Sequence, residues 1–146
     1  GRRFSALRDG LPSASEFSDR VKLFVLNPPR SELYQKINAR SEAHFKAGLV
    51  EEVSLLLEKG LPAESSALGA HAYRRVVEYL QGKRTLESAI EKSKQDVRNY
   101  AKRQLTWFRR ENVAKWLNGF GDDRLIFNEA YKEIEKLLSP TPLKLS

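Results

Sequence analysis

The sequence predicts a mainly α-helical protein with one β-strand near its N-terminal end. Three observations support this class. Apolar residues recur at intervals of three and four along most of the chain, the spacing of one helix face. Single glycines, such as Gly48 and Gly60, follow these segments where helix ends favour glycine. Only residues 21–26, Val-Lys-Leu-Phe-Val-Leu, form the short β-branched and apolar run typical of a strand.

The first 30 residues are expected to hold a helix end, a polar linker and this strand. Asp9-Gly10 would close the helix, and Pro28-Pro29 follows the strand. A lone strand cannot satisfy its edges, so we expect its sheet to lie in sequence before Gly1. The absence of methionine supports the same expectation of a fragment.

Helices are expected next, over residues 31–47, 49–59, 65–82 and 85–110. Ser31, Ser65 or Ser66, and Thr85 are suitable N-caps for the first, third and fourth of these. Residues 112–118 predict a short strand-like return that holds Trp116, and a last helix capped by Asn128 is expected to reach Leu138. We therefore divide the chain into residues 1–30, 31–118 and 119–146.

The composition indicates which classes of partner and which kinds of metal site the chain can have. There are 26 Lys and Arg against 19 Asp and Glu, a net charge of +7, which favours nucleic acid first and an anionic membrane second. Cysteine is absent and there are two histidines, which excludes disulfides and thiolate metal sites and argues against a protein zinc site. No apolar run approaches the roughly 20 residues of a membrane span. We expect a cytosolic protein, a monomer that does not act at a membrane.

Residues 98–110 are the strongest candidate site. The segment interleaves five Lys and Arg residues with Tyr100, Trp107 and Phe108, and contains no acid. Cations neutralise phosphates and flat rings stack on unstacked bases, so the pattern indicates RNA binding. Lys94, Arg98 and Lys102 step by four and are expected to share one face. The alternative is a solvated basic face with Trp107 in the core.

Two weaker candidates lie elsewhere. His71-Ala72-Tyr73-Arg74-Arg75 is a second basic and aromatic cluster, in which Tyr73 can equally belong to the core. Arg40 follows the strand at a position where a guanidinium can clamp a diphosphate, although a surface pair with Glu32 or Glu42 is the simpler interpretation. No GxxxxGK[ST] loop, HExxH motif or Ser-His-Asp elbow is present.

At these residues the sequence resembles the tRNA dimethylallyltransferases. Residues 100–109, Tyr-Ala-Lys-Arg-Gln-Leu-Thr-Trp-Phe-Arg, are similar to the signature helix of that family. Residues 29–40 resemble its PR-x-x-L-x-x-R-I-x-x-R motif, with Lys36 in place of an arginine, and residues 48–53 resemble its G-L-x-x-E-V. The order of these motifs also matches, and the resemblance extends from about Arg2 to Asn118. The family usually has Ile-Gly-Tyr where this chain has His71-Ala72-Tyr73.

The resemblance implies the helical C-terminal part of a P-loop-kinase-like α/β enzyme. Such an enzyme transfers a dimethylallyl group from dimethylallyl diphosphate to the N6 amine of the adenine that follows the anticodon. Its partners would be the tRNA anticodon stem-loop and dimethylallyl diphosphate. Mg²⁺, the phosphate loop and a catalytic aspartate would belong to the part of the fold outside this sequence, so this chain is expected to bind tRNA and to be inactive alone.

The resemblance also assigns residues. Arg40 matches the arginine that stabilises the diphosphate. Two runs match tRNA contacts: Gly69, Ala70, His71, Ala72, Tyr73 and Arg74, and Lys102, Arg103, Gln104, Leu105, Thr106, Trp107, Phe108 and Arg109. The alternatives from other classes are a non-catalytic RNA-binding module and a basic helical scaffold for a protein partner.

Overall fold

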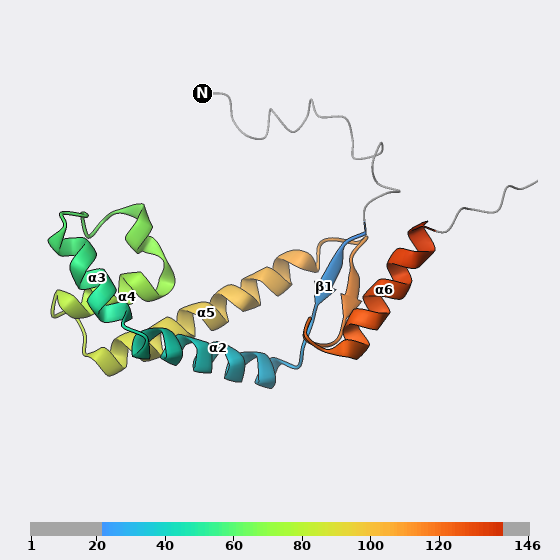
Figure 1. Ribbon diagram of the computed structural model, residues 1–146, viewed down its shortest axis with the longest axis horizontal. Helices are drawn as coiled ribbons and strands as arrows, with labels where there is room; N and C mark the ends of the chain where they lie inside the picture. The colour runs from blue at the N-terminus through green and yellow to red at the C-terminus, as the bar shows by residue number, and fades with distance from the viewer. Residues whose placement is uncertain (1–21, 139–146) are drawn as a thin grey trace, which may run out of the picture. The chain divides into compact units, whose positions relative to one another are not determined.

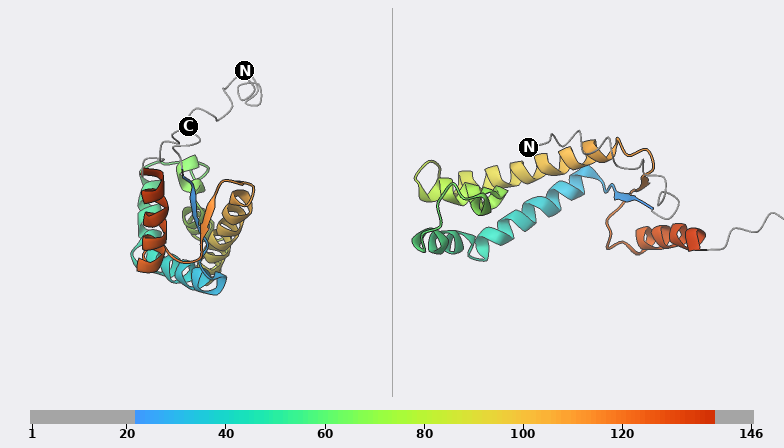
Figure 2. Two further views of the ribbon diagram at one scale, coloured as in Figure 1. Left: turned by 90° about the vertical axis from the view of Figure 1, so that its right-hand side faces the viewer. Right: turned by 90° about the horizontal axis from the view of Figure 1, so that it is seen from above.

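The computed structural model describes residues 22–138 (Figures 1 and 2), so the helix end expected at residues 2–8 lies outside the described residues. The fold is mainly helical, as predicted from the sequence. The described residues form two compact units. One contains residues 28–110, and the other combines residues 22–27 with residues 111–138.

The unit of residues 28–110 consists of four α-helices and one short 3-10 helix. In chain order these are α2 (Arg30–Lys46), α3 (Leu49–Glu58), η2 (Ser66–Gly69), α4 (His71–Leu80) and α5 (Leu86–Phe108). The long helices α2 and α5 run alongside each other, and the α3–α4 pair packs at one end of them (Figure 1).

The helix boundaries follow from local chemistry. Gly48 and Gly60 have φ angles of 98° and 88°, values that favour glycine, and they separate α2 from α3 and end α3. Thr85 caps α5 as predicted, because its hydroxyl accepts a hydrogen bond from the Ser88 amide at 3.2 Å.

Two expectations about helix starts in this unit were wrong. Ser31 lies inside the first turn of α2, whose N-cap is Pro29. The single helix expected over residues 65–82 is divided, because Ala70 is extended (φ −60°, ψ 145°) between η2 and α4. Ser65 does act as a cap, but of η2, where its hydroxyl accepts from the Ala67 amide at 3.4 Å.

The core of this unit lies where α3, η2, α4 and the start of α5 meet. Its buried members are Phe45, Leu49, Val53, Leu68, Val76, Val77 and Ala89. Val53, Val76 and Ala89 are fully buried, and burial of apolar side chains is the main force that holds these short helices together. This core fixes η2 and the first turn of α4 next to α5.

The second unit is a two-stranded parallel sheet with one helix. Strand β1 (Phe24–Leu26) pairs with β2 (Lys115–Leu117), with Val25 opposite Trp116, and α6 (Arg124–Leu138) packs against β2. Both strands were predicted, at residues 21–26 and 112–118. However, the expectation that this chain supplies no partner for the first strand was wrong, because β2 pairs with it.

Helix α6 begins five residues earlier than predicted, at Arg124. Asp123, and not Asn128, accepts a hydrogen bond from a first-turn amide, that of Leu125, at 2.8 Å. Asn128 lies within the helix. None of the helices in residues 22–138 is long and apolar enough to cross a membrane.

Candidate nucleic-acid interface

The two runs predicted to contact RNA meet in the structure. Gly69, His71 and Arg74, from η2 and α4, line one hollow of about 270 Å³ together with Arg103 of α5. Residues about 30 positions apart in sequence therefore share one surface, because α4 packs along α5. Arg75, Asp96 and Asn99 complete the lining.

Aromatic rings lie beside these cations. The rings of His71 and Tyr100 pack edge to face with centroids 5.6 Å apart. The Arg103 guanidinium lies 5.8 Å from the centre of the Tyr100 ring, within the range of a cation–π contact. Tyr100 is 46% exposed, so its ring remains available to a ligand.

Arg103 also lines two neighbouring hollows further along α5. One is shared with Lys102, Thr106, Trp107 and Arg110, and the other with Gln104, Trp107 and Phe108. Trp107 is 57% exposed and packs edge to face on Phe108 with centroids 4.9 Å apart. The alternative that placed Trp107 in the core is therefore wrong for the described residues.

Four cations of this surface have no acidic partner. Lys102, Arg103, Arg109 and Arg110 are exposed, and none makes an ion pair with a carboxylate in residues 22–138. By contrast, Arg75, Arg84 and Lys94 each pair with a carboxylate of a neighbouring segment. Unpaired guanidinium and ammonium groups beside exposed rings are the features of a surface that binds single-stranded nucleic acid.

Some residues of the two runs face inward instead. Ala72 and Tyr73 pack against the core, and the Tyr73 hydroxyl donates a hydrogen bond to Glu52 of α3 at 2.6 Å, which raises the pKa of Tyr73. The Thr106 hydroxyl donates to the Lys102 carbonyl at 2.9 Å. Leu105 is half-buried, whereas Ala70 and Thr106 are exposed. Ala72 and Tyr73 thus help to pack α4 against the core, in addition to lying in a run predicted to contact RNA.

Ala72, which stands where the related motif has glycine, fits its position without strain. It lies in the first turn of α4, and no residue other than glycine has a positive φ angle in the described part of the chain. Left-handed backbone is therefore not required at this position in this chain.

The basic face expected from Lys94, Arg98 and Lys102 is only partly exposed. Lys94 is buried and pairs with Glu42 at 2.6 Å and Glu91 at 2.5 Å, and its hydrogen bonds to these carboxylates raise its pKa. Arg98 donates to Asn38 of α2 at 2.6 Å. These two side chains stabilise the packing of α2 on α5, which leaves Lys102 for solvent.

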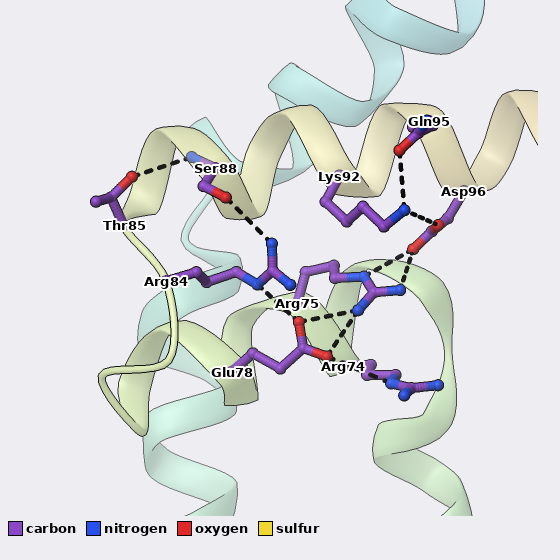
Figure 3. A network of polar contacts seen from close by, with 9 residues as sticks. All are labelled: Arg74, Arg75, Glu78, Arg84, Thr85, Ser88, Lys92, Gln95 and Asp96. Atoms are coloured by element: carbon purple, nitrogen blue, oxygen red, sulfur yellow. Dashed lines mark hydrogen bonds and ion pairs between the residues drawn. The ribbon is translucent and has the colours of Figure 1, made fainter.

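A network of ion pairs joins α4 to α5 (Figure 3), and two of its members, Arg75 and Asp96, also line the hollow. The Arg75 guanidinium contacts Asp96 at 2.6 and 2.7 Å and Glu78 at 2.6 and 2.9 Å. Arg84 pairs with Glu78 at 2.7 Å and donates to Ser88 at 3.1 Å. Arg75, Asn99 and Arg110 lie within the two clusters that the sequence indicated, but Asp96 was not assigned to the site. A signal for Asp96 was its spacing of seven residues from Arg103, which places both on one face of a helix.

The ion pairs of Glu78 predict that the folded protein loses stability in acid. Burial acts to raise the pKa of Glu78, but the hydrogen bonds and charge of Arg75, with the charge of Arg84, outweigh it, so the pKa lies below its ordinary value of 4.5. The unfolded chain then binds the proton more readily than the folded chain. The stabilisation is therefore complete above the ordinary pKa and is lost as the pH falls through the lowered pKa of the folded state.

Glu78→Gln is expected to lower the free energy of unfolding at pH 7 and to flatten its decrease below pH 4.5. Urea unfolding at a series of pH values measures both effects. Glu58→Gln, on the exposed end of α3, is the matched control. Equal changes in the two variants would contradict the assignment to the network.

Arg40 stands apart from the three hollows. It is exposed on α2 and has no hydrogen-bond or ion-pair partner within residues 22–138. The simpler interpretation, a pair with Glu32 or Glu42, is not found: Glu42 is engaged by Lys94, and no contact joins Glu32 to Arg40. In the described part of the chain no group of three or more His, Cys, Asp or Glu side chains is placed to hold a metal ion.

Comparison with known proteins gives matches over most of the chain. The family model described as IPP transferase matches residues 1–111. The tRNA dimethylallyltransferase of Koribacter versatilis is 48% identical over 120 residues, which are 80% of this chain and 38% of that protein. The corresponding protein of Thermosipho africanus is 38% identical over 128 residues, 88% of this chain and 41% of its own length.

Solved structures of the same kind also match. A tRNA isopentenylpyrophosphate transferase from Bacillus halodurans superposes with a TM-score of 0.72 at 33% identity, over 80% of this chain and 39% of that one. A Staphylococcus epidermidis counterpart gives 0.69 at 36% identity, over 78% and 37%. The chain thus spans about two fifths of the length of these relatives. With the family model covering residues 1–111, this chain belongs to the IPP transferase family.

Proposed function

We propose that this chain supplies the tRNA-binding surface of a tRNA dimethylallyltransferase. The whole protein would transfer a dimethylallyl group from dimethylallyl diphosphate to the N6 amine of the adenine that follows the anticodon. The observation that carries the proposal is the meeting of the two runs, at residues 69–74 and 102–109, in one surface with unpaired cations and exposed rings.

The surface suits an anticodon stem-loop. Lys102, Arg103 and Arg109 are exposed and can neutralise phosphates, which supplies affinity without regard to sequence. Arg74 is also exposed, although it pairs with Glu78 at 3.5 Å. Tyr100 and Trp107 offer ring faces on which unstacked bases of a loop can pack. Because a base must leave its stack before its exocyclic amine can react, a protein that grips an open loop lowers the cost of that step.

Arg40 is proposed to stabilise the diphosphate leaving group. Its guanidinium is exposed and has no partner among residues 22–138, so it is free to form a bidentate contact with phosphate oxygens. Stabilising charge that develops on the leaving group lowers the barrier to transfer. As the resemblance implies, the aspartate that accepts the amine proton, the phosphate loop and Mg²⁺ are assigned to the rest of the protein.

We further propose that the isolated chain is a monomer that binds tRNA. It would not transfer the prenyl group, because it has no GxxxxGK[ST] loop to hold the diphosphate. Titration with a labelled anticodon stem-loop at two salt concentrations tests binding. We expect salt-sensitive binding that is tighter than to a fully paired duplex of the same length, because the rings need unstacked bases. Equal affinity for the duplex would show that the surface recognises charge alone.

A further inference from the structure

We infer that Arg75 is a positioning residue of the RNA-binding surface, which holds the two RNA-contacting runs at a fixed spacing through its ion pair with Asp96. The inference rests on the proposed function, and it concerns two residues that the resemblance does not assign to RNA contacts. Arg75 belongs to α4 and Asp96 to α5 (Figure 3), and both line the hollow that the two runs share.

Arg75, Asp96 and Glu78 form a cluster, here called the clamp, whose geometry fixes the orientation of the Arg75 guanidinium. The Arg75 side chain is 13% exposed, and those of Asp96 and Glu78 are 15% and 18% exposed. Arg75 Nε and Nη2 both reach Asp96 Oδ2, at 2.7 and 2.6 Å, while Nη1 reaches both oxygens of Glu78. A planar guanidinium that uses all three of its nitrogens in this way is held in one orientation. A lysine ammonium cannot make the same set of contacts.

The clamp lies on the same helix faces as the RNA contacts. His71 is four residues before Arg75 on α4, and Asn99 and Arg103 are three and seven residues after Asp96 on α5. A shift of α4 along α5 would therefore change the distance from His71 and Arg74 to Arg103 directly. Two cations bind one RNA backbone segment together only if their separation matches its phosphates.

If only the charge of the surface mattered, the clamp variants Asp96→Asn and Arg75→Lys would change RNA affinity differently, so a titration distinguishes the two explanations. Asp96 places a carboxylate beside a hollow proposed for phosphates. If the network served only the net charge of the surface, Asp96→Asn would tighten RNA binding, because a negative charge is lost. Arg75→Lys would leave binding unchanged, because the charge is kept. If Arg75 positions α4, both variants weaken binding.

The experiment is a titration of the full chain and its Asp96→Asn and Arg75→Lys variants with a labelled anticodon stem-loop, at several salt concentrations and at a temperature where circular dichroism shows all of them folded. We expect both variants to bind about three- to tenfold more weakly, with a salt slope reduced by about 0.7, the loss of one phosphate contact on a single strand. Glu64→Gln and Arg124→Lys are the matched controls: they make the same chemical changes at exposed positions outside the clamp and the hollows.

Unchanged or tighter binding by either clamp variant would overturn the inference. So would weaker apparent binding with an unchanged salt slope, because that pattern reports loss of folded protein and not of geometry. If the unmodified chain itself fails to bind the stem-loop, the proposed function fails first, and the two failures are thereby distinguished.

Discussion

Arg103→Ala is expected to weaken binding of an anticodon stem-loop by about tenfold, roughly 1.4 kcal/mol, more than any other single replacement of an exposed cation. The reason is its place in the surface. Arg103 lines all three hollows along α4 and α5 and lies over the Tyr100 ring. Its loss removes a phosphate contact and the cation that the ring supports, so the salt slope also falls, by about 0.7 for a single-stranded contact.

Lys59→Ala is the control for Arg103→Ala, because it removes an exposed positive charge at the end of α3, away from the surface. Fluorescence titration at three salt concentrations gives affinity and slope together. Equal losses in the two variants would mean that RNA responds to the net charge of the chain, and would remove Arg103 from the list of contacts.

Leu68→Ala is expected to give the largest loss of stability, about 2–5 kcal/mol, which is the range for truncating a buried leucine. Leu68 is 2% exposed and is the buried member of η2, the short helix that leads into the first run proposed to contact RNA. The cavity would lie under the start of α4, so RNA affinity is expected to fall with stability.

Leu55→Ala provides the matched comparison for Leu68→Ala. Leu55 lies on α3 and is 50% exposed, so the same chemical change removes little buried area. Urea unfolding followed by circular dichroism measures both. Similar free energies of unfolding for the two variants would contradict the packing of η2 against the core.

The sequence predicted the helices where the chain carries its own start and stop residues. Gly48 and Gly60 mark helix ends by their backbone angles, and Thr85 caps α5, because these choices depend on a few neighbouring residues. The break at Ala70 has a weaker marker, the single glycine Gly69 that ends η2. Leu68 of η2 is buried in the core, a tertiary contact that no local pattern reports.

The site shows the same division between local and long-range information. Spacing by four predicted correctly that Lys94 and Arg98 share a face, but not that this face meets α2. Arg75 pairs with Asp96 and Tyr73 with Glu52, each 21 residues away, so these contacts depend on how α3, α4 and α5 pack. The pairing of β1 with β2 could not be predicted from neighbouring residues either, because the two strands lie near opposite ends of the described chain.

Mapping the RNA on the protein tests most directly the central claim, that two separated runs form one RNA-binding surface. Backbone amide chemical shifts of the labelled chain would be followed by NMR during titration with the anticodon stem-loop. We expect the largest changes together at residues 69–75 and 99–110, with the same apparent affinity for both runs. Changes confined to one run, or centred on α6, would contradict the claim.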